Sequence, residues 1–108
     1  MLGEFEYLIL TAAAQLGEAA YGAAIREKIE DATGSPCSIG ALYTTLDRLE
    51  DKGFIKTRMG DPTPERGGRA KRMVRVTSNG VRAASEFYAA VLQVSKGVSW
   101  QVNRTVRS

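Results

Sequence analysis

The chain has 108 residues, of which 44% are hydrophobic and 25% are charged, and its formal net charge is +3. These values are typical of one modest globular domain. The sequence contains no run of about 18 consecutive apolar residues, so we expect no transmembrane helix. Glu4 and Glu6 stand where a secretory signal would carry Lys or Arg, so we expect a cytoplasmic protein without a membrane partner.

The chain contains no histidine and a single cysteine. Without histidine, Ser–His and Cys–His catalysis, His-ligated zinc and the commonest general base are excluded. Cys37 cannot form an internal disulfide, and its place between Pro36 and a predicted helix suits a small filler side chain. Gly67 and Gly68 lie in a turn and not at a strand-to-helix junction, so they are not a nucleotide fingerprint. We therefore expect no enzyme, no catalytic residue, no cofactor and no metal site.

Charge is unevenly distributed along the chain. Residues 1–52 contain four basic and nine acidic side chains, residues 53–76 contain seven basic and two acidic, and residues 77–108 contain four basic and one acidic. A compact basic segment after an acidic half indicates an anionic partner. A basic hairpin that contacts only water is the alternative that charge alone leaves open.

Two helices are predicted in the first 33 residues. Gly17 ends the first, over residues 3–16, whose apolar residues recur at helical spacing: Phe5, Leu8, Ile9, Ala12 and Leu16. The second, over residues 20–33, would bury one side: Tyr21, Ala24, Ile25 and Ile29. Gly34 would cap this helix, and Pro36 prevents its continuation.

A third helix is predicted between Ser38 and Gly53. Ser38 can accept a hydrogen bond from the free amides of its first turn. Its apolar residues share one side: Ile39, Leu42, Leu46 and Leu49. Because only a few residues, with Gly and Pro among them, separate it from the preceding helix, the pair is typical of a helix-turn-helix.

The opposite side of this third helix is small or hydrogen-bonding: Gly40, Ala41, Thr44, Thr45 and Arg48. Small residues permit close approach to a surface, and threonine and arginine side chains can contact base edges. The helix N-terminus at Ser38 attracts phosphate, and Tyr43 on the flank could place its hydroxyl on a phosphate. On the helix alone, these residues could equally be ordinary surface residues.

Residues 54–59 and 71–77 alternate apolar and polar, which predicts two strands. Ile55, Thr57 and Met59 would share one face, and Val74 and Val76 would face the same core. The polar segment between them is rich in Gly and Pro, which favours a hairpin with a long tip. A helix-turn-helix followed by a basic hairpin is the layout of a winged helix, whose helix enters the major groove while the wing follows the phosphate backbone or minor groove.

Thr77 is predicted to cap a last helix over residues 78 to about 98. One apolar stripe has heptad spacing: Val81, Ala84, Tyr88, Val91 and Val98. A second stripe lies beside it: Phe87, Ala90 and Val94. One stripe can pack on its own domain, whereas the other needs another partner. We expect Val81, Ala84, Tyr88 and Val91 to form a homodimer, with burial in the core of the same chain as the alternative.

Four segments together resemble one family: LGEFEYLIL, AYGAAIREKIE, SIGALYTTLDRLEDKGFI and PERGGRAKRMVRVTSNG. In this order they are similar to the PadR family of bacterial transcriptional regulators, over residues 2–95. The resemblance implies a mainly α fold with a small β-hairpin, divided into a winged helix-turn-helix domain (1–77) and a C-terminal dimerisation helix with a tail (78–108). Met73 and Val74 stand where the family often has aromatic residues, a departure that bears on packing at the base of the wing.

The resemblance also implies which residues contact double-stranded DNA. On the recognition helix it marks Gly40, Ala41, Tyr43, Thr44 and Arg48, to which helix geometry adds Ser38 and Thr45. On the wing it marks Arg66, Arg69, Lys71 and Arg72. Similar short-tailed regulators hold aromatic or cationic compounds near the dimer interface, and Trp100 could line such a cavity or be a packing anchor.

The sequence thus predicts a sequence-specific DNA-binding repressor that acts as a homodimer on a palindromic operator and is released by a small-molecule effector. The alternative is a winged-helix module that binds another protein and no DNA. Steep weakening of binding with salt would favour DNA, because cations bound to the phosphates are released.

Overall fold

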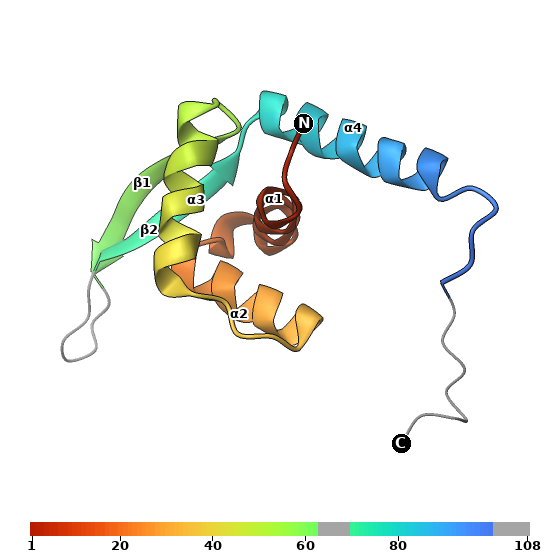
Figure 1. Ribbon diagram of the computed structural model, residues 1–108. Coiled ribbons are helices and arrows are strands. Elements are labelled where there is room, and N and C mark those ends of the chain that lie inside the picture. The colour runs from red at the N-terminus through yellow and green to blue at the C-terminus, as the bar shows by residue number, and fades with distance from the viewer. Residues whose placement is uncertain (63–69, 101–108) are drawn as a thin grey trace, which may run out of the picture.

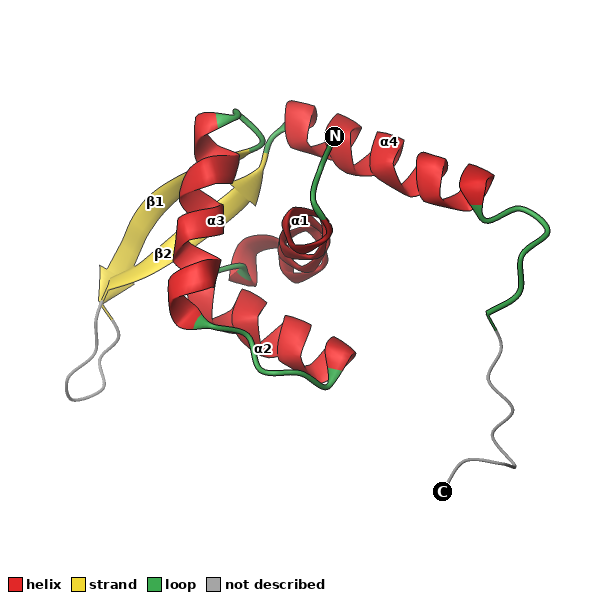
Figure 2. Cartoon of the chain, in the orientation of Figure 1, coloured by secondary structure: helices red, strands yellow, loops and turns green. Residues whose placement is uncertain are grey.

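The computed structural model describes residues 1–62 and 70–100 of the chain. Within them it contains α-helices, a short 3-10 helix and a two-stranded antiparallel sheet (Figures 1 and 2). In chain order the elements are α1 (Glu4–Leu16), η1 (Gly17–Ala19), α2 (Gly22–Thr33), α3 (Ile39–Asp51), β1 (Ile55–Pro62), β2 (Ala70–Val76) and α4 (Ser78–Val94). The expected mainly α fold with a small β-hairpin is confirmed.

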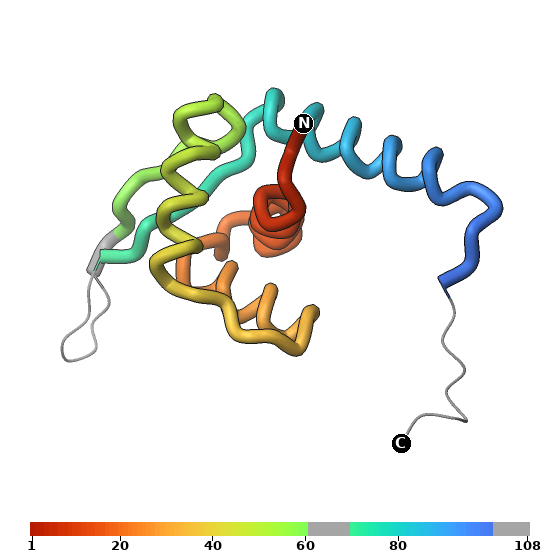
Figure 3. Tube along the Cα trace, in the orientation of Figure 1, coloured from red at the N-terminus to blue at the C-terminus, as the bar shows by residue number. Residues whose placement is uncertain are grey.

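Helix α1 lies at the centre of the fold and contacts each of the other α-helices. Figure 1 shows it nearly end-on between α2 and α4, with α3 in front of the hairpin. The chain passes from α2 to α3 through a short turn (Figure 3), which completes the helix-turn-helix. Helix α4 extends away from the rest of the chain toward its C-terminal end. The fold therefore exposes one side of α3 and much of α4.

The core is made by the apolar sides that periodicity predicts. The largest fully buried side chains come from all three N-terminal helices and β1: Ile9, Leu10, Ile25, Leu42, Leu46, Leu49 and Ile55. Burial of each such side chain stabilises the fold by about 1.5–3 kcal/mol. The hairpin pairs Ile55 with Val76 and Thr57 with Val74. Ile55 and Val74 are buried, as the alternation of each strand predicts.

Helix ends follow the predicted capping residues. The Ser38 hydroxyl accepts a hydrogen bond from the Ala41 amide at 3.2 Å, and the Thr77 hydroxyl accepts one from the Gly80 amide at 3.1 Å. Gly34 ends α2 in the left-handed region, with φ of 70°. Each such cap satisfies backbone groups that a helix terminus otherwise leaves without a partner.

Several sequence predictions are wrong in detail. Ile39 is 55% exposed, because the first residue of α3 lies beyond the packed surface, and Met59 is 62% exposed, because it lies toward the tip of the hairpin. Helix α4 ends at Val94 and not near residue 98. Helix α2 begins at Gly22 and not at Ala20, because the Ala20 carbonyl accepts a hydrogen bond from the Val74 amide at 3.0 Å. The strand-like pairing of Tyr21 with Met73 was not predicted.

The start of α4 is held closely against the α3–β1 turn. The Thr77 amide donates to the Phe54 carbonyl at 3.0 Å, and the Thr77 hydroxyl donates to the Gly53 carbonyl at 2.6 Å. At Gly80, an added Cβ would meet the Phe54 carbonyl oxygen and lie 2.9 Å from Val76 Cγ1. Backbone cannot move aside as a flexible side chain can, so this position requires glycine.

We predict that Gly80→Ala lowers the free energy of unfolding by about 1–3 kcal/mol, because the added methyl group overpacks a backbone contact. Chemical denaturation measures the change. The matched control is Gly40→Ala, since a Cβ at residue 40 has Ser38 Oγ at 3.8 Å as its nearest neighbour. That variant should be as stable as the unmodified protein or slightly more so. Equal stability of the two variants would contradict this reading of Gly80.

Glu6 joins the start of α1 to the residue that follows α3. Its side chain is buried, and its carboxylate accepts hydrogen bonds from the Gly3 amide at 2.9 Å and from Lys52 Nζ at 2.8 Å. Burial alone would raise the pKa of Glu6. The two hydrogen bonds and the positive charges of Lys52 and Arg48 outweigh it, and the pKa is lowered from its ordinary value of 4.5. The ionised carboxylate therefore stabilises the fold.

A lowered pKa in the folded state means that this stabilisation is complete above the unfolded pKa and is lost as the pH falls through the folded pKa. We predict that Glu6→Gln is less stable than the unmodified protein by about 1–3 kcal/mol at pH 7. The difference should shrink as the pH is lowered from about 5 to below 4. Denaturation at several pH values measures it, with exposed Glu4→Gln as the control. A difference that does not change with pH would exclude a role for the ionised carboxylate.

Candidate nucleic-acid interface

The outer side of α3 presents the small and hydrogen-bonding residues that the sequence predicts for it. Gly40, Ala41, Thr44 and Arg48 are all exposed. Thr44 and Arg48 are one helical turn apart, so they lie above each other on the same side. Arg48 forms no ion pair with any residue in the described part of the chain. This side, with Ser38 at its N-terminal end, is a candidate contact surface on which the Thr44 and Arg48 side chains are exposed.

Thr45 does not belong to that surface, and its predicted position there is wrong. It is 5% exposed, and its hydroxyl donates a hydrogen bond to the Ala41 carbonyl at 2.7 Å. At 100° per residue, Thr45 lies about 40° from Leu49 around the helix axis, on the edge of the buried side. A threonine can occupy this position because the preceding turn of its own helix satisfies its hydroxyl. We therefore remove Thr45 from the candidate contacts.

Tyr43 lies half-buried on the flank of α3, against the start of α2. A Cβ added at Gly22 would meet the Tyr43 hydroxyl and lie 2.8 Å from its Cζ. Gly22 thus lets α2 and α3 approach each other closely, and the ring of Tyr43 fills the space that a side chain would take. This contact explains Gly22 as a packing requirement beside the candidate contact surface.

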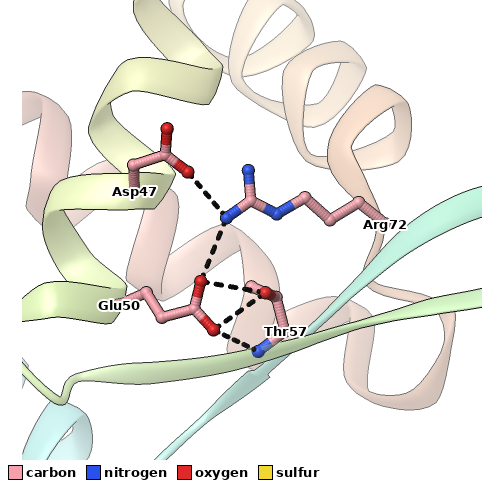
Figure 4. Close-up of polar contacts among 4 residues, drawn as sticks. All are labelled: Asp47, Glu50, Thr57 and Arg72. Atoms are coloured by element: carbon pink, nitrogen blue, oxygen red, sulfur yellow. Dashed lines mark hydrogen bonds and ion pairs between the residues drawn. The ribbon is translucent and has the colours of Figure 1, made fainter.

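Arg72 points inward from β2 to α3, where two carboxylates hold its guanidinium (Figure 4). Arg72 Nη2 lies 2.9 Å from Asp47 Oδ1 and 3.2 Å from Glu50 Oε1, and the Arg72 side chain is 19% exposed. Its Cζ is 6.0 Å from the centroid of the Tyr43 ring. The sequence prediction that Arg72 contacts phosphate on the wing did not include these two carboxylate partners. The strand alternation places Arg72 with Val74 on the side that faces α3.

Glu50 extends the same cluster to the other strand. Its carboxylate accepts hydrogen bonds from the Thr57 hydroxyl at 2.9 and 3.0 Å and from the Thr57 amide at 3.2 Å (Figure 4). The hydrogen bond from the Thr57 hydroxyl is the main cause of the lowered pKa of Glu50, with the charge of Arg72 adding to it. Glu50 is therefore ionised at neutral pH, and α3, β1 and β2 meet at its carboxylate.

The other predicted wing cations have different surroundings. Lys71 Nζ lies 4.4 Å from the centroid of the Tyr21 ring, a cation–π contact toward the tip of the hairpin. Arg66 and Arg69 lie outside the described residues. Sequence reasoning missed Lys56, Arg58 and Arg75, which are exposed on the face of the hairpin that points away from α3. The alternation of side chains along each strand could have shown that these three residues lie on the opposite face of the hairpin from Arg72.

Those missed cations border a hollow of about 810 Å³ between the hairpin, the end of α1 and the start of α4. Its lining includes Ala13, Met73 and Val81 as well as the basic residues. A second hollow, of about 430 Å³, is lined by Leu2, Phe54 and Phe87 among others. Trp100 lines neither hollow and is 84% exposed.

Helix α4 packs on the rest of the chain with one side only. Phe87 lies on the inner side, with its ring centroid 4.9 Å from that of Tyr7. The outer side exposes a stripe of large apolar residues: Val81, Tyr88, Val91 and Leu92. Ala84, predicted in that stripe, is half-buried against the core, and Val98 lies beyond the end of the helix. Leu92 is an exposed neighbour that the prediction missed.

The described residues contain no group of three or more His, Cys, Asp or Glu side chains that could hold a metal ion. In residues 1–62 and 70–100, no helix is long and apolar enough to span a bilayer. Cys37 is buried, and burial, with the nearby charge of Glu30, raises the pKa of its thiol. The cysteine is thus suited to packing, as its sequence context predicts.

A helix-turn-helix followed by an antiparallel hairpin packed on its second helix is a winged helix. Residues 9–86 match the model of the transcriptional regulator PadR-like family. The chain therefore belongs to the PadR-like family of transcriptional regulators, and it is a regulator rather than an enzyme. A comparison with curated protein sequences gave no match.

Solved structures have the same fold. A PadR family transcriptional regulator from Eggerthella lenta has a TM-score of 0.68 at 27% identity, covering 88% of this chain and 82% of that one. RosR from H. salinarum has a TM-score of 0.70 at 28% identity, covering 91% and 81%. A PadR-like regulator from Bacillus cereus has a TM-score of 0.70 at 23% identity, covering 87% and 86%, and supports the fold alone.

Proposed function

We propose that the protein is a sequence-specific DNA-binding repressor that acts in the cytoplasm as a homodimer on a palindromic operator. The observation that carries this proposal is the outer side of α3, where Gly40, Ala41, Thr44 and Arg48 are exposed next to a basic hairpin. Membership of a family of transcriptional regulators supports the same function.

The chemistry of this surface suits the major groove, which is about 12 Å wide and admits an α-helix. Gly40 and Ala41 let the N-terminal turn approach the bases, and Ser38 marks the helix end that favours phosphate. Thr44 can exchange hydrogen bonds with base edges, and Arg48 can bond guanine or a phosphate. Tyr43 contributes a hydroxyl at the edge of the surface. Of the wing residues, Arg66, Arg69 and Lys71 remain proposed backbone contacts.

The exposed stripe of α4 supports the homodimer. Val81 is 57% exposed, Tyr88 54%, Val91 46% and Leu92 54%. Several large apolar side chains in one line favour burial against a second copy. A two-fold pair of recognition helices would read half-sites about 34 Å apart, which matches one turn of the duplex. Residues 1–77 would then bind DNA, and residues 78–108 would pair the protomers.

A small-molecule effector that releases the operator is the last part of the proposal. Trp100 is accessible for an effector contact, since 84% of the residue is exposed. It is the only tryptophan of the chain. Quenching or a shift of intrinsic fluorescence therefore reports on this residue directly when candidate compounds are added.

We predict that Arg48→Ala weakens operator binding by about 1–3 kcal/mol and relaxes sequence preference at one base pair, because a bidentate base contact is lost. Binding is measured by titration of labelled operator and of single-base variants. Arg82→Ala, which removes the same charge from exposed α4, is the control and should bind nearly as well as the unmodified protein. Unchanged affinity and preference in Arg48→Ala would remove Arg48 from the base-reading residues.

We predict that Tyr88→Glu combined with Val91→Glu converts the dimer to monomers, because both carboxylates would have to be buried in the interface. Light scattering coupled to gel filtration gives the mass. Gln93→Glu places a new charge on α4 away from the stripe and should leave the dimer intact. A double variant that stays dimeric, with its helical spectrum unchanged, would show that the interface lies elsewhere.

A further inference from the structure

We propose that Arg72 strengthens DNA binding without touching DNA, by offsetting part of the negative charge of Asp47 and Glu50 and by fixing the wing against the recognition helix. The inference rests on the proposed DNA-binding function. It concerns a positioning residue that neither the sequence pattern nor the family match identifies in this role.

The geometry leaves Arg72 little freedom to reach a phosphate. Its Nη2 is held at 2.9 Å by Asp47 and at 3.2 Å by Glu50, and the Arg72 side chain is 19% exposed. The ring of Tyr43 lies beside the guanidinium, with 6.0 Å between Arg72 Cζ and the ring centroid. Arg72 could bind a phosphate only after its contacts with Asp47 and Glu50 were broken.

The two carboxylates lie where negative charge is unfavourable for binding DNA. Asp47 is three residues after Thr44 and next to Arg48, so it borders the proposed contact surface, and its side chain is 67% exposed. DNA carries about one negative charge per 1.7 Å of helix axis, and charges within about 8–10 Å of each other are only partly screened by salt. The guanidinium of Arg72 offsets one of the two negative charges and lies against both. Without Arg72, both would repel the phosphate backbone.

The same contacts join the wing to the recognition helix. Glu50 on α3 binds Arg72 on β2 and Thr57 on β1, so both strands are attached to one carboxylate (Figure 4). Thr57 is paired with Val74, two residues along β2 from Arg72, which keeps the cluster on one face of the hairpin. A wing held in this way loses less conformational freedom when it binds the phosphate backbone of DNA. The entropic cost of ordering the wing therefore offsets less of the binding free energy.

A double-mutant cycle separates action through the carboxylates from direct phosphate contact. The variants are Arg72→Met, the pair Asp47→Asn with Glu50→Gln, and all three substitutions together, each full-length and titrated with the operator selected by the unmodified protein. We expect Arg72→Met alone to bind about tenfold more weakly, and the same substitution to change affinity by less than about twofold once the carboxylates are absent. Equal losses in both backgrounds, or no loss in either, would overturn the inference.

Control substitutions and the salt dependence of binding show whether the effect is specific to Arg72 and its two carboxylate partners. Arg75→Met removes the same charge from the opposite face of β2 and should show no coupling to the carboxylates, whereas Arg72→Lys should recover part of the lost affinity. In the background that carries Asp47→Asn and Glu50→Gln, adding Arg72→Met should leave the slope of log affinity against log salt unchanged. A slope that decreases by about one in that background would show a direct phosphate contact and contradict the proposal. Unfolding midpoints of all variants show that each is folded at the binding temperature.

The proposed DNA-binding function and the proposed role of Arg72 would be overturned by different results. If the unmodified protein selects no DNA sequence, the proposed function is overturned and this inference with it. If it selects an operator but the Arg72→Met loss persists in the absence of Asp47 and Glu50, only the inference is overturned.

Discussion

Burial of the leucine side of α3 is the constraint on which the rest of the structure depends. Leu42, Leu46 and Leu49 are each 0% exposed and pack with residues of α1, α2 and β1. Because these side chains fix the rotation of the helix about its axis, they also decide which residues face outward. The exposed surface of Gly40, Ala41, Thr44 and Arg48 is thus a direct consequence of the core. The packing of the core is therefore sufficient to orient α3 for the proposed DNA contact.

Polar contacts then set the position of the neighbouring elements relative to α3. At its C-terminal end, Lys52 binds Glu6 on α1, and Glu50 binds Thr57 on β1. Arg72 on β2 reaches the same helix through Asp47 and Glu50. Glu6 is buried, so its pair contributes to stability, whereas the partly exposed pairs of Arg72 contribute little individually. The importance of the Arg72 pairs lies in geometry, since they hold the hairpin at one angle to a helix whose rotation the core has already fixed.

Periodicity and capping residues predicted most of the fold, because they report local physics. The apolar spacing around Leu42, the cap at Ser38 and the alternation around Val74 all correspond to what the structure contains. The errors arise where tertiary contacts decide. Thr45 is buried because its own helix satisfies its hydroxyl, and Ala20 is held by β2 instead of continuing α2. The partners of Arg72 could not be predicted, because a sequence shows that a residue is charged and does not show which carboxylates it meets across the fold.

The outer side of α3 is the surface that we propose reads DNA. The decisive experiment is selection of bound sequences from a random duplex pool, repeated at two salt concentrations. We expect enrichment of a palindrome whose half-site centres are about 10 base pairs apart, with affinity that falls steeply as salt rises. A pool without an enriched sequence, or binding that does not change with salt, would contradict it and favour a winged helix that binds protein.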